Sequence, residues 1–207
     1  MKAENFKNSP SGYLAPTIAN CQAFVPNSLP PARSLNLEPY INLIEASSRL
    51  LGELSGIGGT LPDPNLLINP FARKEAVASS RIEGTVTTLD ELFAFEVGAS
   101  AAARSDTREV HNYIRALRYG IELLPDLPVS NRLIRTLHEV LMQGVAPHRG
   151  AKIVPGEFKR DQNWIGARLI QNARFVPPPP NLSDDCMVDL EKYIHAENGG
   201  HPLLVKM

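Results

Sequence analysis

A hydroxyl and a carboxylate are spaced for one helix face at Ser79 and Glu83. The two residues are four apart in the segment 79–84, of sequence SSRIEG, so on a helix they lie one turn apart on the same side. Gly84 is typical of a residue that ends a helix. A carboxylate in a last helical turn faces the negative end of the macrodipole, which costs about 0.3–1 kcal/mol. A distant cation would offset that cost, which makes Glu83 a candidate binding residue; the alternative is an ordinary exposed glutamate before a glycine cap.

The pattern Ser/Thr-x-x-x-Glu-Gly resembles the inhibitory helix of Fic-family (Fic/DOC) proteins, enzymes that transfer AMP from ATP to hydroxyl groups of target proteins. In that family the glutamate pairs with the second arginine of the catalytic motif HPFx(D/E)GNGRxxR and fills the place of the ATP γ-phosphate. The resemblance implies that Ser79, Glu83 and Gly84 form an inhibitory element that gates ATP placement.

Other stretches occur in the order found in the family, so the resemblance covers about residues 36–207. They are 66–70, 85–92, 109–117, 137–142, 155–160, 162–166 and 173–180. The last two resemble the two sides of the family's flap hairpin, which holds a target segment by main-chain pairing and covers the nucleotide. Flap, nucleotide or target-docking roles are thereby implied for Trp164, Ile165, Gly166, Asn172, Ala173, Arg174 and Phe175.

The catalytic motif of the family does not occur in these 207 residues. His201 and Pro202 are followed by Leu-Leu-Val instead of the Gly-Asn-Gly-Arg anion nest, so no catalytic residue is assigned. The chain is therefore interpreted as the N-terminal portion of a Fic-family protein adenylyltransferase, truncated before the motif. It carries the autoinhibitory helix and the docking flap, and we expect it to be inactive by itself.

A second hypothesis is a stand-alone regulatory module that inserts the helix bearing Glu83 into a separate Fic enzyme in trans. The flap favours the first hypothesis, because a dedicated inhibitor needs no docking edge. ATP and Mg²⁺ are the cofactors implied for the complete family enzyme. Neither is expected to bind tightly to this chain alone, since the motif that holds them is missing. The implied partner is a target-protein segment on the flap edge, and a homodimer is left open.

Composition predicts a globular protein of the cytoplasm. The chain has 43% apolar and 21% charged residues and a net charge of −1, so no basic footprint for nucleic acid or an anionic membrane is present. Cys21 and Cys186 lie far apart, which disfavours a disulfide framework. The five histidines have no metal-ligand spacing, so no metal site is expected. No signal peptide or membrane-spanning stretch is found in the sequence.

The predicted fold is mainly α-helical with one short β-hairpin, the flap, at about residues 158–180. Residues 1–35 are expected to be an extended proline-rich arm, 36–98 a Fic N-terminal region and 105–207 the first part of a Fic domain whose catalytic helices are missing. Apolar spacing predicts a helix over residues 37–54 that stops at Gly56, Gly58 and Gly59. The inhibitory helix should run over about residues 70–83, beginning at Pro70.

Capping residues predict the start of the other helices. Thr88 and Glu91 have the spacing of a capping box for a helix that ends near Val97. Asp106 with Thr107 and then Ser130 should begin the next two helices. Two further helices are expected from Ser183 and from Pro202.

Overall fold

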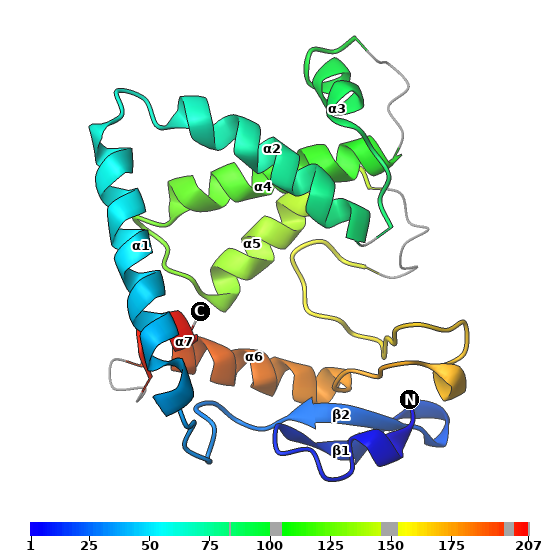
Figure 1. The fold of residues 1–207 in the computed structure, drawn as a ribbon. Coiled ribbons are helices and arrows are strands. Elements are labelled where there is room, and N and C mark those ends of the chain that lie inside the picture. The colour runs from blue at the N-terminus through cyan, green and yellow to red at the C-terminus, as the bar shows by residue number, and fades with distance from the viewer. Residues whose placement is uncertain (83, 100–104, 146–152, 197–200, 207) are drawn as a thin grey trace. The chain divides into compact units, whose positions relative to one another are not determined.

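The computed structural model describes residues 1–82, 84–99, 105–145, 153–196 and 201–206. The chain divides into two compact units. Unit 1 contains residues 1–35, 129–131 and 152–207, and unit 2 contains residues 36–128 and 132–151. Figure 1 shows the fold, and each unit is described by itself.

Unit 1 contains an antiparallel two-stranded sheet made by the first residues of the chain. Strands β1 (Gly12–Pro16) and β2 (Gln22–Pro26) pair in the register Gly12↔Pro26 to Pro16↔Gln22. Short 3₁₀ helices lie before and between them at Ala3–Asn5 (η1) and Ile18–Asn20 (η2). Each strand ends at a proline, and the residues that follow, Thr17 and Asn27, donate their N–H groups to the Cys21 and Ser11 carbonyls at 2.9 Å.

The core of unit 1 joins this hairpin to a segment about 150 residues later in the sequence. Ala23 packs with Ile170, Ala173 and Val176, all buried, and Trp164 lies against them. Phe6, Phe24 and Phe175 form a group of tilted rings with centroids 5.4, 5.9 and 6.2 Å apart, a favourable arrangement for aromatic pairs. Residues 12–26 of the expected extended arm are thus a hairpin that packs against the segment at residues 170–176.

Unit 1 also contains a 3₁₀ helix, η5 (Ile170–Asn172), and the helices α6 (Pro180–His195) and α7 (Leu203–Lys206). Residues 129–131 belong to it through α6, because the Asn131 amide donates to Glu191 Oε2 at 2.8 Å and the His195 ring bonds the Val129 carbonyl at 2.8 Å. The Tyr193 hydroxyl hydrogen-bonds His201 Nδ1 at 3.1 Å, which holds the start of α7 against α6.

Unit 2 is helical. It contains a 3₁₀ helix, η3 (Glu38–Tyr40), and the helices α1 (Ile41–Thr60), α2 (Asn65–Ile82), α3 (Leu89–Glu96), α4 (Ser105–Leu123) and, apart from its first residue, α5 (Asn131–Leu141). The core lies where α2, α3 and α4 meet, and it is made of Ala76, Leu92, Val110 and Ile114, each no more than 2% exposed. This core positions the end of α2.

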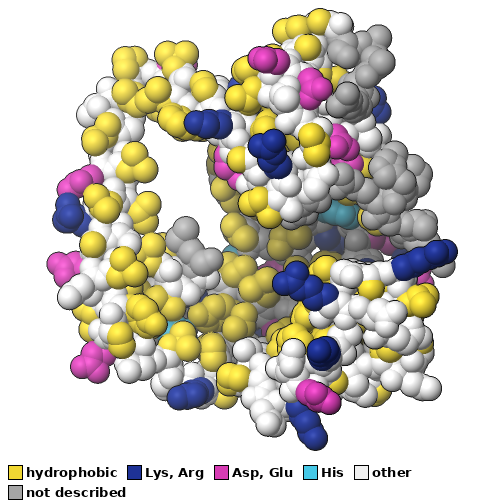
Figure 2. Space-filling model, turned by 45° about the vertical axis from the view of Figure 1, so that its right-hand side comes forward, with side chains coloured by type: hydrophobic (Ala, Val, Ile, Leu, Met, Phe, Trp, Pro, Cys, Tyr) yellow, Lys and Arg dark blue, Asp and Glu magenta, His cyan; other side chains and the backbone are white. Residues whose placement is uncertain are grey.

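Helix α1 has no buried residue. Apart from Ile44, which is partly buried, its large apolar side chains are half to two-thirds exposed, and those of the first half of α2 are at least half exposed. Figure 2 shows hydrophobic side chains along the surface of α1. Helix α1 is thus held by its own backbone hydrogen bonds more than by burial of a side-chain face.

The predicted fold class is confirmed: the structure is mainly helical with one two-stranded antiparallel sheet. The sheet, however, is the hairpin at residues 12–26. In the segment 162–176, where the flap hairpin was expected, the structure has one antiparallel bridge, Ile165↔Phe175. The four prolines from Pro177 lack N–H donors, and η5 interrupts the return strand, so pairing does not extend further.

Three helix boundaries also differ from the prediction. Helix α1 continues through Gly56, Gly58 and Gly59 to Thr60; Leu61, which precedes Pro62, takes an extended ψ of 132° and ends it. Helix α2 begins at Asn65, with Pro70 inside it. Helix α6 begins at Pro180, three residues before the expected cap at Ser183. Pro180 was expected to belong to the end of the flap strand, but the fixed φ of proline suits the first turn of a helix.

Candidate functional site

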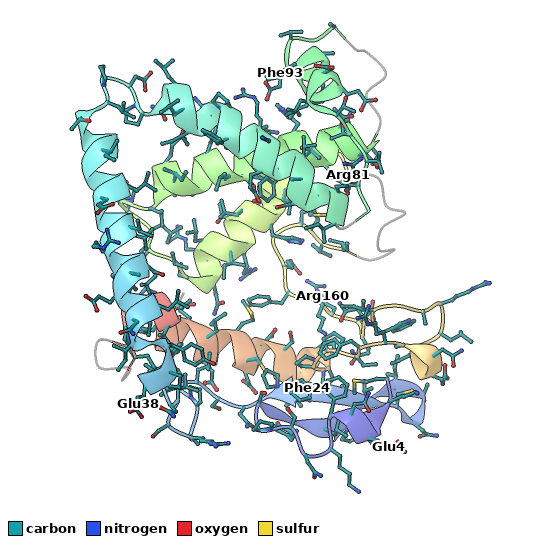
Figure 3. The ribbon with its side chains drawn as sticks, viewed as in Figure 1. Glu4, Phe24, Glu38, Arg81, Phe93 and Arg160 are labelled. Carbon is teal, nitrogen blue, oxygen red and sulfur yellow. The ribbon has the colours of Figure 1, made fainter. Side chains whose placement is uncertain are left out.

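Helix α2 is described to Ile82, and Gly84 just after it has the backbone of a residue that closes a helix, as its sequence position predicted. Gly84 has φ of +85°, its N–H donates to the Arg81 carbonyl at 3.1 Å and the Thr85 N–H donates to the Ser80 carbonyl at 3.0 Å. This pair of bonds is the Schellman motif, in which a left-handed residue closes a helix. Ile82 is 89% exposed. Figure 3 labels Arg81, the residue before it, near the end of α2. Gly84 therefore closes the helix, and the Arg81 and Ile82 side chains just before position 83 are exposed to solvent.

Ser79 lies on α2, one turn before this end, and Glu83 lies outside the described residues. The Ser79 hydroxyl donates to Glu75 Oε1, so the serine bonds the residue four before it. The sequence reasoning missed Glu75. The sequence could have indicated the contact between Glu75 and Ser79, because these residues have the same four-residue spacing as residues 79 and 83.

Glu75 also connects α2 to α4. Its second oxygen, Oε2, accepts a hydrogen bond of 3.0 Å from the Tyr113 hydroxyl. Burial raises the pKa of Tyr113, and the hydrogen bond to the Glu75 carboxylate raises it further because that bond needs the phenol proton. Ser79, Glu75 and Tyr113 thus form a short chain of hydrogen bonds from the last turns of α2 to α4.

The residues after Gly84 are bound to the first turns of α4. The Val86 N–H donates to Asp106 Oδ2 at 2.8 Å, and the Thr87 and Thr107 hydroxyls are 3.0 Å apart. Thr85, 4% exposed, reaches Glu109 Oε2 with its hydroxyl at 3.4 Å.

Helix α3 then begins with the predicted capping box. The Glu91 N–H donates to Thr88 Oγ1 at 3.2 Å, and Glu91 Oε2 accepts from the Thr88 N–H at 2.9 Å. The backbone on the far side of Gly84 is therefore fixed by α4 and by the cap of α3.

A charged cluster fastens the other end of α3. The Arg73 guanidinium on α2 makes three hydrogen bonds of 3.0–3.2 Å to the Glu96 carboxylate, and both side chains are less than a fifth exposed. His111 on α4 places Nδ1 3.9 Å from Glu96 Oε1, with the Phe95 ring edge-on at 5.1 Å. Burial lowers the pKa of His111; Arg115, Arg118 and Arg73 lower it further, and Glu96 opposes them.

The second candidate region, residues 162–176, lies in unit 1. The Ile165 N–H donates to the Phe175 carbonyl at 2.9 Å, and the Arg174 N–H donates to the Ile165 carbonyl at 2.8 Å. Gly166 has φ of +90°, and a Cβ there would lie 2.6 Å from Arg174 Cβ, so only glycine fits. These contacts bring Ile165, Gly166, Arg174 and Phe175 together.

The remaining predicted flap residues have structural contacts. The Trp164 indole N–H donates to the Ala167 carbonyl at 3.0 Å. Asn172 ends η5, and Ala173 is buried in the core of unit 1. The Phe24 N–H of β2 donates to the Val176 carbonyl at 2.8 Å, so β2 is bonded to the end of this segment; Figure 3 labels Phe24. Ile165, on the other arm of the bridge, is 58% exposed.

The two candidate regions belong to different units, Ser79 and Gly84 to unit 2 and residues 164–175 to unit 1. Within the described part of the chain, no group of three or more His, Cys, Asp or Glu side chains could hold a metal ion. Across those same residues, no helix combines the length and the apolar character needed to span a bilayer.

Residues 41–122 match the family model described as Fic/DOC family N-terminal. By this match, the stretch is similar to the N-terminal region of Fic/DOC family proteins. It spans α1, α2, α3 and α4 up to the next-to-last residue of α4. The Fic/DOC region therefore includes Ser79, Gly84 and every contact described above between α2 and α4. Residues 162–176 lie outside the matched stretch, so their flap and docking roles stay predictions. The inhibitory role of Glu83 also stays a prediction, because Glu83 lies outside the described residues.

Proposed function

We propose that the Fic/DOC N-terminal region of this chain regulates AMP transfer by a Fic-type protein adenylyltransferase, with α2 as the inhibitory helix. The family match over residues 41–122 carries the proposal. Two features of α2 support it. The helix closes at Gly84 through a glycine motif, and Arg81 and Ile82 near its end are exposed and so accessible to another segment.

In this proposal Glu83 competes with the γ-phosphate of ATP for an arginine of the family motif. A carboxylate and a phosphate oxygen are alternative partners for one guanidinium, because both accept its paired N–H donors. While Glu83 holds the arginine, ATP cannot settle in the orientation that transfers AMP. The residues that bind phosphate and Mg²⁺ in the family are not among these 207 residues, so the role assigned to this chain is regulatory.

The proposal assigns target docking to the open edge at Ile165. In an antiparallel pair, every second residue exchanges both of its backbone hydrogen bonds with the partner strand. The residues between them point their N–H and C=O groups away from that strand. Trp164 and Gly166 therefore direct their main-chain groups away from Phe175. An extended target segment added along this side would be held mainly by backbone hydrogen bonds, which suits targets of varied sequence.

The test of the regulatory role is Glu83→Gly in a form of the chain that carries the family motif joined to its carboxyl end. Loss of the competing carboxylate should raise transfer of labelled AMP from ATP to protein about ten-fold or more, because a hydrogen bond to a charged group is worth about 1.5–3 kcal/mol. The 207-residue chain gives the baseline, with no transfer expected.

Ser80→Ala is the matched control, since residue 80 lies about 100° around the helix from residue 79 and its carbonyl bond to Thr85 survives the change. Transfer by the control should equal that of the unmodified form. Unchanged or lower transfer by Glu83→Gly would contradict the inhibitory role.

A further inference from the structure

One face of α4 holds the end of α2 on both sides of position 83. Asp106, Glu109 and Tyr113 are spaced i, i+3 and i+7, so they lie along one side of α4. We call these three residues the α4 stripe. Tyr113 binds Glu75, which also accepts the Ser79 hydroxyl, before the last turn of α2. Asp106 and Glu109 bind Val86 and Thr85 after it.

We infer that Asp106 and Tyr113 are positioning residues, which set the direction of the last turn of α2 and so the inhibition that it exerts. The regulatory part of this inference rests on the proposed function. The geometric part does not, because it concerns only the described residues on α2, α4 and the link between α2 and α3.

The hydrogen bonds within α2 cannot by themselves set the direction of the chain at its end, so contacts with a second element are needed. The end of a helix has unpaired carbonyl groups and frays readily. The Schellman bonds close the turn but leave the direction of the following chain to other contacts. Here that direction is fixed by a 2.8 Å bond from the Val86 N–H to the Asp106 carboxylate and by the buried Thr87–Thr107 pair, 9% and 3% exposed. The bond to Asp106 is charge-assisted and, at 2.8 Å, shorter than the 3.4 Å bond from Thr85 to Glu109, so it should contribute most.

Hydrogen exchange of the 207-residue chain tests the geometric part. The Gly84 and Thr85 amides are the probes, because they donate to Arg81 and Ser80 carbonyls that a change in α4 does not touch. Asp106→Ala should make both amides exchange about ten-fold faster, since the lost bond to a charged group is worth at least a factor of ten in local opening. Tyr113→Phe should act in the same direction and less strongly.

Two matched controls lie on the same helix. Glu122→Ala and Tyr119→Phe alter exposed side chains of α4 beyond the α4 stripe, and exchange at Gly84 and Thr85 should stay at the unmodified rate in both. The Ile114 amide, in the middle of α4, reports global opening. Rates at Gly84 and Thr85 that are unchanged in both stripe variants, or that rise only in step with Ile114, would overturn the inference.

AMP transfer tests the regulatory part, in the form that carries the family motif. Asp106→Ala and Tyr113→Phe should each raise transfer, and neither should add to the effect of Glu83→Gly, because they act through the same residue. An additive effect, or no effect beside an active Glu83→Gly, would refute the link to inhibition. If Glu83→Gly itself is without effect, the proposed function fails, while the exchange measurement still decides the geometric claim.

Discussion

At the scale of single residues, His111 is held in a setting that disfavours its charge. Its Nδ1 is buried and has no hydrogen-bond partner within the described part of the chain. Glu96 is the nearest carboxylate, at 3.9 Å, but Arg73 already makes three hydrogen bonds to it, which offsets its attraction for an imidazolium. Burial is the largest cause of the lowered pKa. The neutral ring is thus the form that fits the fold.

We predict that His111 makes the protein less stable in mild acid. The ordinary pKa of histidine is 6.5 and the folded value is lower, so near and below pH 6.5 the unfolded chain binds more protons at this site. Stability therefore falls as the pH drops through that value. In His111→Gln, the loss of melting temperature between pH 7.5 and pH 5.5 should be smaller than in the unmodified chain. An equal loss in both proteins would contradict this reading of His111.

Residue-level sequence reasoning found the positions that a local rule defines. Gly84 was predicted because only glycine readily closes a helix with positive φ, and Thr88 with Glu91 because a capping box has fixed spacing. For Glu75 the four-residue spacing to Ser79 was a usable signal that was overlooked, whereas no local rule indicates its contact with Tyr113, 38 residues later. Glu83 stays a prediction of the sequence.

At the scale of elements, glycine and proline explain most differences between the expected and observed boundaries. The three glycines near the end of α1 weaken a helix without stopping it, whereas Pro62 forces the residue before it out of the helical region. A different property of proline explains why α6 begins at Pro180: its fixed φ and missing N–H suit the first position of a helix. Composition alone cannot decide between a glycine that lies within a helix and one that closes it.

Two glycine substitutions should therefore have opposite effects on stability. An added Cβ meets nothing within 4 Å at either Gly84 or Gly52, so packing does not enter. Gly84→Ala imposes a side chain on a φ of +85° and should lower the free energy of unfolding by about 1–2 kcal/mol. Gly52→Ala, inside α1, should raise it by about 0.5–1 kcal/mol. Urea unfolding measures both, and effects of the same sign would contradict the assigned conformations.

At the scale of the whole molecule, the sequence could not show which distant segments form each unit. Phe24 and Val176 are bonded in unit 1 although 152 residues separate them. Periodicity and capping signals extend over one element only. The fold class followed from those signals, whereas the pairing of the first 35 residues with the segment around residues 164–176 depends on complementary apolar surfaces that no single stretch reveals.

The two units should unfold in separable steps, because each has its own hydrophobic core. Trp164, the only tryptophan, reports unit 1 by fluorescence, while circular dichroism at the helix band is dominated by α1 to α5 of unit 2. Val176→Ala should shift the fluorescence transition, and Leu92→Ala should shift the helix transition by about 2–5 kcal/mol. Both side chains are fully buried, so the pair is matched. If either substitution shifted both transitions equally, the chain would unfold as one cooperative unit and the division would be wrong.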